Sequence, residues 1–343
     1  MSLVSRKVIK LSVFLFILNF PFVALSESDF LNNSEVEVLI NELVLENGLD
    51  RQSLIEIFSK AQLKDSVLKL MTRPAEKIKP WFEYRDIFVS KSRIKNGLLF
   101  YQKNIDILIR ASKRFGVPPE IIVSIIGVET SYGTNTGSYL VIDALSTLAF
   151  HYPSELKNYS RRKTYFTNEL KNYLVLTEKQ QLDPLALRGS YAGAMGFGQF
   201  MPSSYRNYAI DFDGDGRVDI WENIADAVGS VANYLAKHGW VEGDEIVVPA
   251  DFLGNAEESW LNAGLKPQKT VGELVAMEFT TKTAMPPSSL ATAIALEGEK
   301  GTEYWMGFKN FYVITRYNHS TMYALSVYQL AEAIKEKLIV AGQ

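Results

Sequence analysis

The sequence predicts a mostly α-helical protein of the α+β class, with a small antiparallel β subdomain ahead of its last helix. Up to Gly239, apolar residues recur at three- and four-residue spacings, as they do in helices with one buried face. Between Gly239 and Ser320 the chain instead holds short runs of Val, Ile, Thr and aromatic residues, separated by Gly, Pro or Asn. At about 150 residues per domain, the length of 343 residues corresponds to two or three domains.

The composition is that of a soluble globular protein, with 47% hydrophobic and 22% charged residues. The formal net charge is −3, and basic residues are scattered among acidic ones, so we expect no nucleic-acid partner. The chain contains no cysteine. This excludes disulfides, thiolate metal sites, cysteine nucleophiles and a lipid anchor carried by an N-terminal cysteine.

Residues 1–26 have the pattern of a secretory signal peptide. Three basic residues, the last of them Lys10, precede an apolar stretch from Leu11 to Leu25, and Ala24-Leu25-Ser26 resembles a cleavage site. The uninterrupted apolar core is shorter than the roughly 20 residues that span a bilayer. We therefore expect cleavage near Ser26, export, and a mature chain that is soluble, without a membrane span or a lipid anchor.

The helices are predicted from apolar periodicity and from their end signals. Val36, Leu39 and Leu43 define the first apolar face. Pro118 and Pro119 suit the first turn of a helix that is almost entirely apolar. Helices are expected over residues 34–70, 96–115, 120–131, 141–150, 162–179, 225–238 and 320–340.

The strands are predicted from β-branched and aromatic residues bounded by turn residues. They are expected at Glu245–Val248, Gly272–Thr281, Leu290–Leu296 and Phe311–Tyr317.

Glu129 is the carboxylate that fits its surroundings least. It ends the apolar run that begins at Ile121, at the helix end where the dipole disfavours negative charge. Burial and the dipole both oppose ionisation, so the pKa of Glu129 is expected to be raised. A carboxylic acid that stays protonated near neutral pH can protonate the leaving oxygen in glycoside cleavage. An exposed Glu that merely follows the last core residue would show the same pattern.

A glycine- and alanine-rich segment, Gly189 to Ser204, is the second feature. Small side chains there permit close approach of a ligand to the backbone, although tight helix packing would also use them. Gln199 within this segment favours a binding site, since a buried amide must find hydrogen-bond partners.

Taken together, these segments resemble the lytic murein transglycosylase B family, which is glycoside hydrolase family 103. The resemblance runs in order from about Tyr84 to Leu330. It is carried by Pro80–Arg85, Gly127-Val128-Glu129-Thr130-Ser131-Tyr132-Gly133, Arg161–Phe166, Ser190–Ser204 and Arg316–Tyr323.

The resemblance implies a lysozyme-like core whose catalytic acid is Glu129. It further implies an N-terminal helical region, residues 27–107, packing with the C-terminal helix 319–343. The catalytic core would span residues 108–244 and the β subdomain residues 245–318. The residues that it places around the reacting sugar are Ser190, Gln199, Tyr317, Asn318 and Tyr323, and those further out are Tyr84, Arg161, Arg162, Tyr165 and Met195.

Residues 211–222 match the EF-hand loop pattern at every required position. Oxygen ligands would come from Asp211, Asp213 and Asp215, from the carbonyl of Arg217, from Asp219 through water, and from Glu222. The family resemblance implies a longer loop in which Asp226 supplies the closing carboxylate instead. A single loop in an exported protein indicates structural Ca²⁺ rather than signalling, and no organic cofactor is expected.

Three functions are compatible with the sequence. The first is a periplasmic lytic transglycosylase that acts on peptidoglycan glycan strands, with cell-wall synthesis proteins as possible partners. The second is a hydrolytic muramidase, and the third is a non-catalytic, calcium-stabilised wall-binding module. Hydrolases generally use two carboxylates. Downstream of Glu129 the next acid, Asp143, is expected to cap a helix beginning at Ala144, and later acids such as Glu155, Glu169 and Glu178 lie in polar surroundings. One working acid favours the transglycosylase, in which the substrate's own N-acetyl group stabilises the developing cation.

Overall fold

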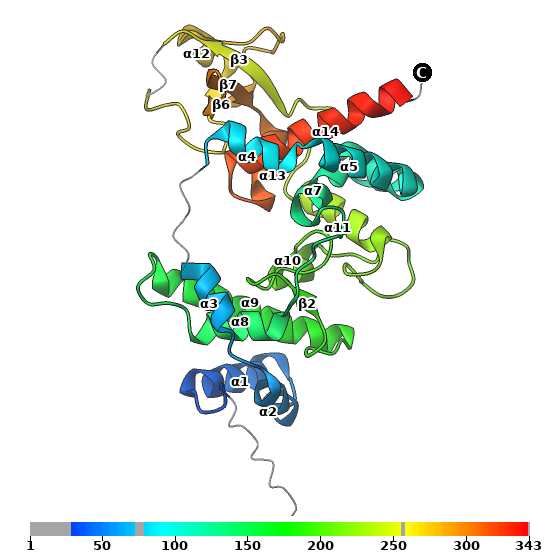
Figure 1. Ribbon diagram of the computed structural model, residues 1–343, viewed down its shortest axis with the longest axis vertical. Helices are drawn as coiled ribbons and strands as arrows, with labels where there is room; N and C mark the ends of the chain where they lie inside the picture. Colours follow the sequence, from blue (N-terminus) through cyan, green and yellow to red (C-terminus); the bar gives the residue numbers. More distant parts are fainter. Residues whose placement is uncertain (1–28, 73–78, 255–257, 342–343) are drawn as a thin grey trace, which may run out of the picture.

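The computed structural model describes residues 29–72, 79–254 and 258–341 (Figure 1). The predicted signal peptide, residues 1–26, lies outside this range. Within the described ranges, none of the helices combines the length and apolar character needed to cross a membrane. The helices are α1 Ser34–Asn47, α2 Arg51–Lys60, α3 Asp65–Thr72, α4 Trp81–Phe88, α5 Lys91–Lys103, α6 Ile105–Phe115, α7 Pro119–Thr130, α8 Val141–Phe150, α9 Tyr159–Gln180, α10 Pro202–Tyr208, α11 Ile224–Lys237, α12 Val271–Ala276, α13 Lys309–Tyr317 and α14 Thr321–Ala341.

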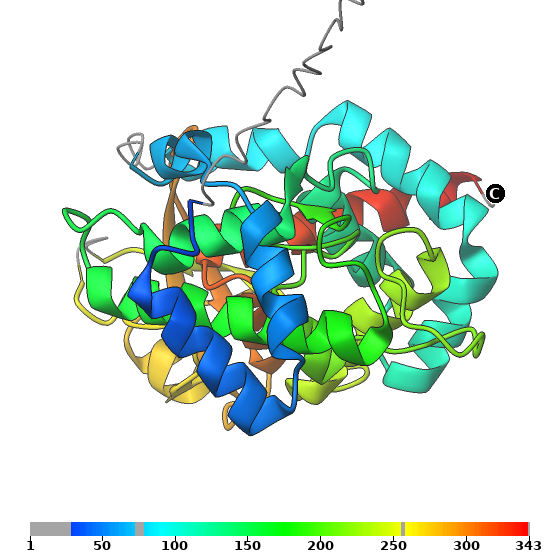
Figure 2. The ribbon, with the colours of Figure 1, turned by 90° about the horizontal axis from the view of Figure 1, so that it is seen from below.

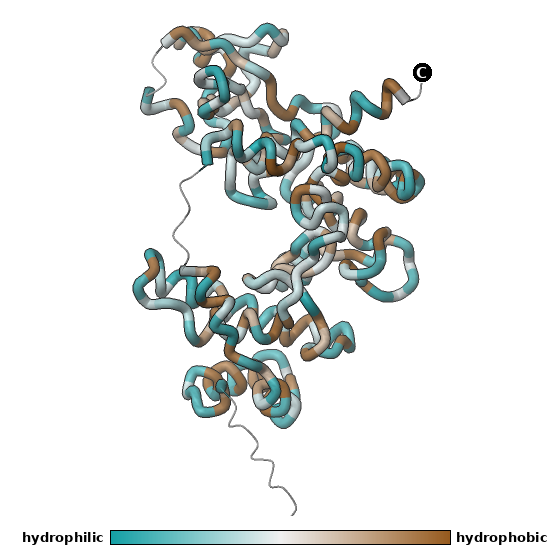
Figure 3. Tube along the Cα trace, in the orientation of Figure 1, coloured by the Kyte–Doolittle hydropathy of each residue, from teal (hydrophilic) through white to brown (hydrophobic). Residues whose placement is uncertain are grey.

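The first predicted helix, over residues 34–70, is divided into α1, α2 and α3 by local capping. Asn33 and Asp50 accept hydrogen bonds from backbone N–H groups in the first turns of α1 and α2. Gly48 ends α1 in the left-handed region, at φ 70°, a conformation that glycine adopts without steric cost. In Figure 3 the tubes of these helices change between hydrophobic and hydrophilic within each turn, as expected when one face packs and the other is solvated.

The described part of residues 27–107 packs in two different places. Helix α1 contacts α9 and α3 contacts α8, whereas α4 and α5 contact α14. Figure 2 shows α1 and α2 lying across the green helices α8 and α9. In Figure 1 the same two helices lie far from α4, α5 and α14. Within the described part of residues 27–107, it is α4 and α5 that pack with the last helix.

Helix α7 forms the centre of the larger core. Every residue from Ile121 to Val128 is buried, and the helix contacts α5, α6, α11 and α14. Helix α8 is buried over its whole length. The expectation that Asp143 caps a helix beginning at Ala144 is wrong, because α8 begins at Val141. The Asp143 carboxylate instead accepts a hydrogen bond from Gln62 N at 2.9 Å and pairs with Lys64 Nζ at 3.2 Å. It thus tethers the α2–α3 connection to α8.

The β subdomain is a five-stranded antiparallel sheet in the order β4-β6-β7-β3-β5. Figure 1 shows its strands β3, β6 and β7 at the top of the molecule. Its hairpin β6–β7 pairs Gly298 with Gly301 at the turn. The sheet and its flanking helix enclose a second, smaller core around Leu274, Phe279 and Met306. The strands are β3 Val247–Phe252, β4 Lys269–Thr270, β5 Phe279–Thr280, β6 Leu290–Gly298 and β7 Gly301–Gly307; a separate pair joins β1 Tyr139–Leu140 to β2 Arg188–Gly189.

Two of the four predicted strands are wrong. Gly272–Thr281 contains α12 and only the short β5, because Thr270 and Glu273 form a capping box that begins a helix. Phe311–Tyr317 lies in α13, whose Phe311, Val313 and Ile314 are buried. Aromatic and β-branched residues favour strands, but here tertiary burial of one helical face outweighs that preference. Strand β7 was not predicted, since its sequence begins with Gly, Thr and Glu.

Candidate active site

Glu129 lies in the last turn of α7, where the backbone turns sharply. Ser131 and Tyr132 both have positive φ, at 53° and 63°, and Gly133 follows at 86°. The N–H groups of Ser131 and Tyr132 bond to the carbonyls of Gly127 and Ile126, which closes the helix. Thr130 Oγ1 donates to Phe197 O at 2.9 Å and thereby ties this end of α7 to the glycine-rich segment. The Glu129 side chain is held at the rim of a rigid, buried helix.

Three tyrosines from distant parts of the chain surround the Glu129 carboxyl. The Tyr323 hydroxyl, from α14, donates to Glu129 Oε1 at 2.7 Å, and Tyr323 is only 2% exposed. The pKa of Tyr84, on α4, is raised by burial and by the charge of Glu129. The pKa of Tyr317, at the end of α13, is raised by the same two causes. The structure therefore brings Tyr84, Tyr317 and Tyr323 together around Glu129.

Burial raises the pKa of Glu129 to about 7, against the opposing effect of the hydrogen bond from Tyr323. Within the described chain, no second carboxylate contributes to this shift. The Asp143 carboxylate is occupied in the tether to the α2–α3 connection. The site thus holds a carboxyl group whose pKa burial raises to near neutral pH.

The glycine-rich segment is fixed against this site by hydrogen bonds. Ser190 Oγ accepts from Ala194 N at 3.0 Å. Gln199 has a φ of 49°, and its Nε2 donates to Thr136 O and Gly196 O, both at 3.1 Å. The Tyr317 hydroxyl donates to Gly198 O at 2.6 Å. A Cβ atom at residue 198 would lie 2.7 Å from that hydroxyl, so this contact requires glycine.

The remaining predicted ligand-binding residues are more dispersed. Arg161, Arg162 and Tyr165 lie exposed on α9, where the Arg162 guanidinium lies 5.1 Å from the Phe166 ring centroid. Asn318 is exposed beside Tyr317. Met195 differs from all of these, because its side chain is 0% exposed and packs in the main core. The structure therefore presents no part of the Met195 side chain to a ligand.

Tyr234 is a neighbour of the site that the sequence did not indicate. Its ring centroid lies 4.7 Å from that of Tyr317 and 5.8 Å from that of Phe200, and its hydroxyl donates to Arg316 O at 2.5 Å. Helical periodicity identifies Tyr234 only as a core residue of α11. No sequence pattern separates a tyrosine that supports a site from one that only fills the core.

Glu169 was expected in polar surroundings, and this expectation is wrong. Glu169 is only 3% exposed, and its carboxylate accepts hydrogen bonds from Ser203 N at 2.8 Å and from Ser203 Oγ at 2.7 Å. Burial raises the pKa of Glu169, and the bonds from Ser203 oppose that rise. Helix α10 has no side-chain cap of its own, so Glu169 supplies one from α9.

Replacing Glu169 by Ala should lower the free energy of unfolding by about 2 kcal/mol, because it leaves the half-buried N–H and hydroxyl of Ser203 without their acceptor. Asn172→Ala is the matched control on the same α9–α10 contact. It removes the exposed hydrogen bond from Arg206 and should cost less than about 1 kcal/mol. Urea unfolding measures both values. Equal losses in the two variants would contradict the capping role of Glu169.

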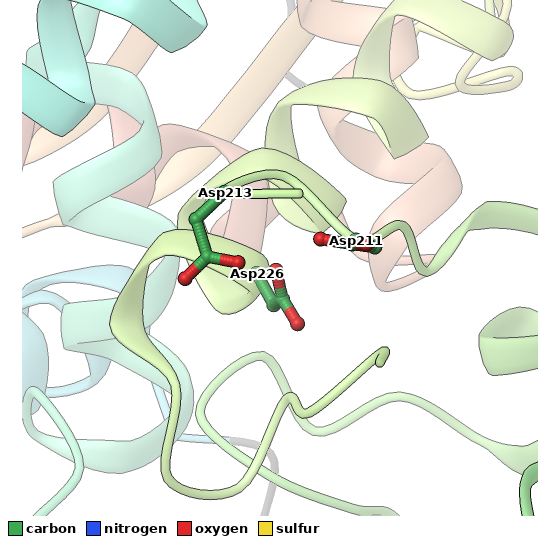
Figure 4. Close-up of side chains that lie close together, drawn as sticks. All are labelled: Asp211, Asp213 and Asp226. Atoms are coloured by element: carbon green, nitrogen blue, oxygen red, sulfur yellow. The ribbon is translucent and has the colours of Figure 1, made fainter. Parts of the chain in front are cut away.

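The acidic loop brings three carboxylates together (Figure 4). One carboxylate oxygen from each of Asp211, Asp213 and Asp226 lies within 4.8 Å of the others. Asp226 is buried in the first turn of α11 and accepts from Phe212 N and Asp219 N, both at 2.7 Å. Burial raises the pKa of Asp226, whereas the bond from Asn223 lowers the pKa of Asp213.

The other predicted ligands are not part of this group. Asp215 Oδ1 accepts from Arg217 N at 2.8 Å, and Asp219 Oδ1 accepts from Trp221 N and Glu222 N. Glu222 and Arg217 are exposed. An all-oxygen set of carboxylates suits a hard cation such as Ca²⁺. Of the two candidates for the closing carboxylate, the structure places Asp226 beside Asp211 and Asp213.

The site holds a desolvated carboxylic acid, a group that can protonate a departing sugar oxygen, and it therefore fits an enzyme that cleaves glycosidic bonds. The transglycosylase SLT domain family matches residues 32–332. Membrane-bound lytic murein transglycosylase B of Escherichia coli K12 is 44% identical over 315 residues, which cover 89% of this chain and 84% of that protein. The chain therefore belongs to the transglycosylase SLT family, and it is a lytic murein transglycosylase, a lyase that acts on peptidoglycan.

Solved structures agree with this assignment. The soluble lytic transglycosylase SltB1 from Pseudomonas aeruginosa is 48% identical, with a TM-score of 0.83 over 88% of this chain and 99% of that one. An Escherichia coli lytic transglycosylase in complex with calcium is 44% identical, with a TM-score of 0.82 over 91% and 96%. A third relative, SltB3 from Pseudomonas aeruginosa in complex with NAG-NAM-pentapeptide, is 29% identical, with a TM-score of 0.76 over 88% and 79%. The predicted family and its lysozyme-like fold are confirmed.

Proposed function

We propose that the chain cleaves the β-1,4 bond between N-acetylmuramic acid and N-acetylglucosamine without consuming water, and that Glu129 acts first as acid and then as base. The observation that carries this proposal is the Glu129 carboxyl itself. It is desolvated, it accepts a hydrogen bond from Tyr323 at 2.7 Å, and its pKa of about 7 owes nothing to a second described carboxylate. Both protonation states are accessible near neutral pH, as a residue that gives and then takes a proton requires.

The reaction would proceed in two steps. Protonated Glu129 donates its proton to the glycosidic oxygen, and the bond to the muramyl C1 breaks as the substrate's N-acetyl group stabilises the developing cation. The Glu129 carboxylate then accepts the proton of the muramyl 6-hydroxyl, whose oxygen bonds to C1. The product carries a 1,6-anhydro ring, and Glu129 is protonated again for the next cycle.

The products decide between the transglycosylase and a hydrolytic muramidase. Mass spectrometry of muropeptides released from purified peptidoglycan should find ends that are lighter by one water than hydrolytic ends. Reducing ends in their place would support the muramidase. A protein that binds peptidoglycan but releases no product would correspond to the wall-binding module.

We further propose that the residues around Glu129 bind the glycan strand. Serine, tyrosine, asparagine and glutamine side chains can hydrogen-bond sugar hydroxyl and N-acetyl groups, while aromatic faces cover the apolar side of a sugar ring. Since a relative has been solved with a pentapeptide-bearing disaccharide, we propose that the natural substrate here also carries peptide stems. The proposed residues near the reacting sugar are Ser190, Gln199, Tyr317, Asn318 and Tyr323, and those further out are Tyr84, Arg161, Arg162 and Tyr165.

We propose that Asp211, Asp213 and Asp226 hold a structural Ca²⁺, in line with the calcium complex of the Escherichia coli relative. The ion would join the loop to α11 and so stabilise the folded state, to which it binds preferentially.

Adding Ca²⁺ to metal-stripped protein should therefore raise the melting temperature. At a free Ca²⁺ concentration of 100 times the dissociation constant, the free energy of unfolding should gain about 2.7 kcal/mol. Asp226→Asn should remove most of this gain, because it takes away the buried carboxylate of the group. Glu222→Gln, a change to an exposed side chain of the same loop, should keep it. Loss of the gain in Glu222→Gln alone would assign the closing ligand to Glu222 instead. Differential scanning calorimetry measures all three proteins.

We propose that the protein works in the periplasm after cleavage near Ser26, and that it carries no lipid because it has no cysteine to bear one. Cell-wall synthesis proteins would be its partners at the peptidoglycan. N-terminal sequencing of the periplasmic fraction tests the processing. A cytoplasmic protein that begins at Met1 would contradict it.

A further inference from the structure

A groove of the β subdomain begins beside the tyrosines that surround Glu129. Tyr84 lies one turn along α4 from Pro80, and Tyr323 directly follows Met322 on α14. One helical turn rises about 5 Å, so the groove starts close to both tyrosines. Its volume is about 350 Å³, and its lining includes Lys79–Trp81, Asn262, Ala295–Glu297 and Ser320–Met322.

One wall of this groove is an edge of strand β6. In an antiparallel pair, alternate residues bond to the partner strand and the residues between them direct N–H and C=O to the opposite side. The β6–β7 hairpin closes at the pair Gly298–Gly301, so Leu296 also bonds toward β7. Ala295 and Glu297 therefore direct their backbone groups toward the other edge.

The side chain of Asn262 already occupies this edge at Ala295. Asn262 Nδ2 donates to Ala295 O at 2.8 Å, and Ala295 N donates to Asn262 Oδ1 at 3.0 Å. A side-chain amide thus takes the place that a peptide group of a neighbouring strand would take. Strand β4 covers the same edge further along, at Ala291. The next position, Glu297, opens onto the groove.

We propose that the β6 edge at Glu297 binds the peptide stem of the murein strand by backbone pairing, while the sugar that carries the stem lies at Glu129. This inference rests on the proposed function. Open strand edges accept extended peptides through main-chain hydrogen bonds, and the Asn262 amide shows that this edge accepts that geometry. The stem is covalently attached to the muramyl residue, so a groove next to the sugar site is within its reach. Lys79, which is exposed in the same groove, provides a cation for a stem carboxylate.

The test compares two substrates and two variants at one position. The substrates are peptide-bearing glycan strands and the same strands after an amidase has removed the peptides. Glu297→Pro removes the outward N–H, and proline is tolerated on an edge strand at such a position. Glu297→Gln keeps the N–H and removes only the charge. The quantity measured is the ratio of kcat/KM on the peptide-bearing strands to that on the stripped strands.

The wild type should prefer the peptide-bearing strands, and Glu297→Pro should lower that ratio roughly fivefold, the effect of about one hydrogen bond. Glu297→Gln should keep the ratio, and both variants should cleave stripped strands like the wild type. A wild type without preference, an unchanged ratio in Glu297→Pro, or an equal loss in Glu297→Gln would each overturn the inference. Absence of 1,6-anhydro products from both substrates would count against the proposed function instead.

Amide hydrogen exchange in the wild type tests the same edge without a substitution and without turnover. Exchange in β6 should slow on addition of a peptide-bearing anhydro-disaccharide and not on addition of the peptide-free one. Equal protection by the two ligands would overturn the inference even if Glu297→Pro failed to fold.

Discussion

Replacing Glu129 by Gln is expected to reduce turnover of peptidoglycan by at least 10³- to 10⁴-fold, the upper part of the range for general acid–base catalysis. The amide is nearly isosteric and can still accept the hydrogen bond from Tyr323, so the fold should be kept. It can neither protonate the leaving oxygen nor accept the proton of the 6-hydroxyl. Because Glu129 serves as the acid in the first step and as the base in the second, the substitution removes catalysis of both steps. Release of soluble muropeptides under single-turnover conditions measures the effect.

Glu120→Gln is the matched control, because Glu120 lies at the opposite end of the same helix. It should retain nearly the full rate. Wild-type activity in Glu129→Gln would exclude Glu129 as the catalyst. Unchanged binding of glycan by the inactive variant would show that the loss lies in the chemistry.

The pH dependence of kcat/KM should follow the protonation of Glu129. Burial raises the pKa of this group from its usual range to about 7. The reaction begins with the protonated form, which predominates below the pKa and decreases above it. Activity should therefore fall above about pH 7, by about tenfold per pH unit and by roughly 100-fold at pH 9. A profile that falls from pH 5 onward would mean that Glu129 is not desolvated as the structure indicates.

Tyr323→Phe should move this alkaline limb to higher pH. The hydrogen bond from Tyr323 lowers the pKa of Glu129, and burial, which raises it, remains in the variant. A limb that moves to lower pH would contradict the assignment of Tyr323 as a donor to the carboxylate. Initial rates between pH 5 and 9.5, measured for both proteins, give the shift directly.

Helix prediction succeeded where one sequence signal dominated. The almost entirely apolar run and the two prolines at its start predict α7 to within one residue at each end, and periodicity predicts α8 over its full observed range, although Asp143 inside it was taken for a cap. It failed at α13, where Phe311, Val313 and Ile314 favour a strand locally but are buried on one helical face. Burial against residues distant in the sequence determined the helical conformation of α13. The local residue pattern holds no information about that burial.

For the candidate site, too, local sequence signals indicated some residues, whereas others depend on the tertiary structure. Glu129 could be singled out from the sequence, because an acid at the C-terminal end of an apolar helix conflicts with both burial and the helix dipole. The spacing of the acidic loop indicated Asp211 and Asp213 as candidate metal ligands, but that Asp226 lies beside them depends on how α11 folds back onto the loop. Glu169 was misjudged because its partner, Ser203, lies 34 residues away.

By itself, the sequence determined the family and the helical character of the core, and it singled out Glu129 as the candidate catalytic acid and the acidic loop as a candidate metal site, because each follows from residues that are neighbours along the chain. Only the tertiary structure decided that Tyr323, from α14, donates to Glu129, that Met195 packs in the core, and that Ala295–Glu297 of β6 line a groove with the start of α4 and α14. Tyr323 is 194 residues from Glu129 along the chain. Contacts over such separations depend on how helices pack in three dimensions, and local periodicity carries no record of that packing.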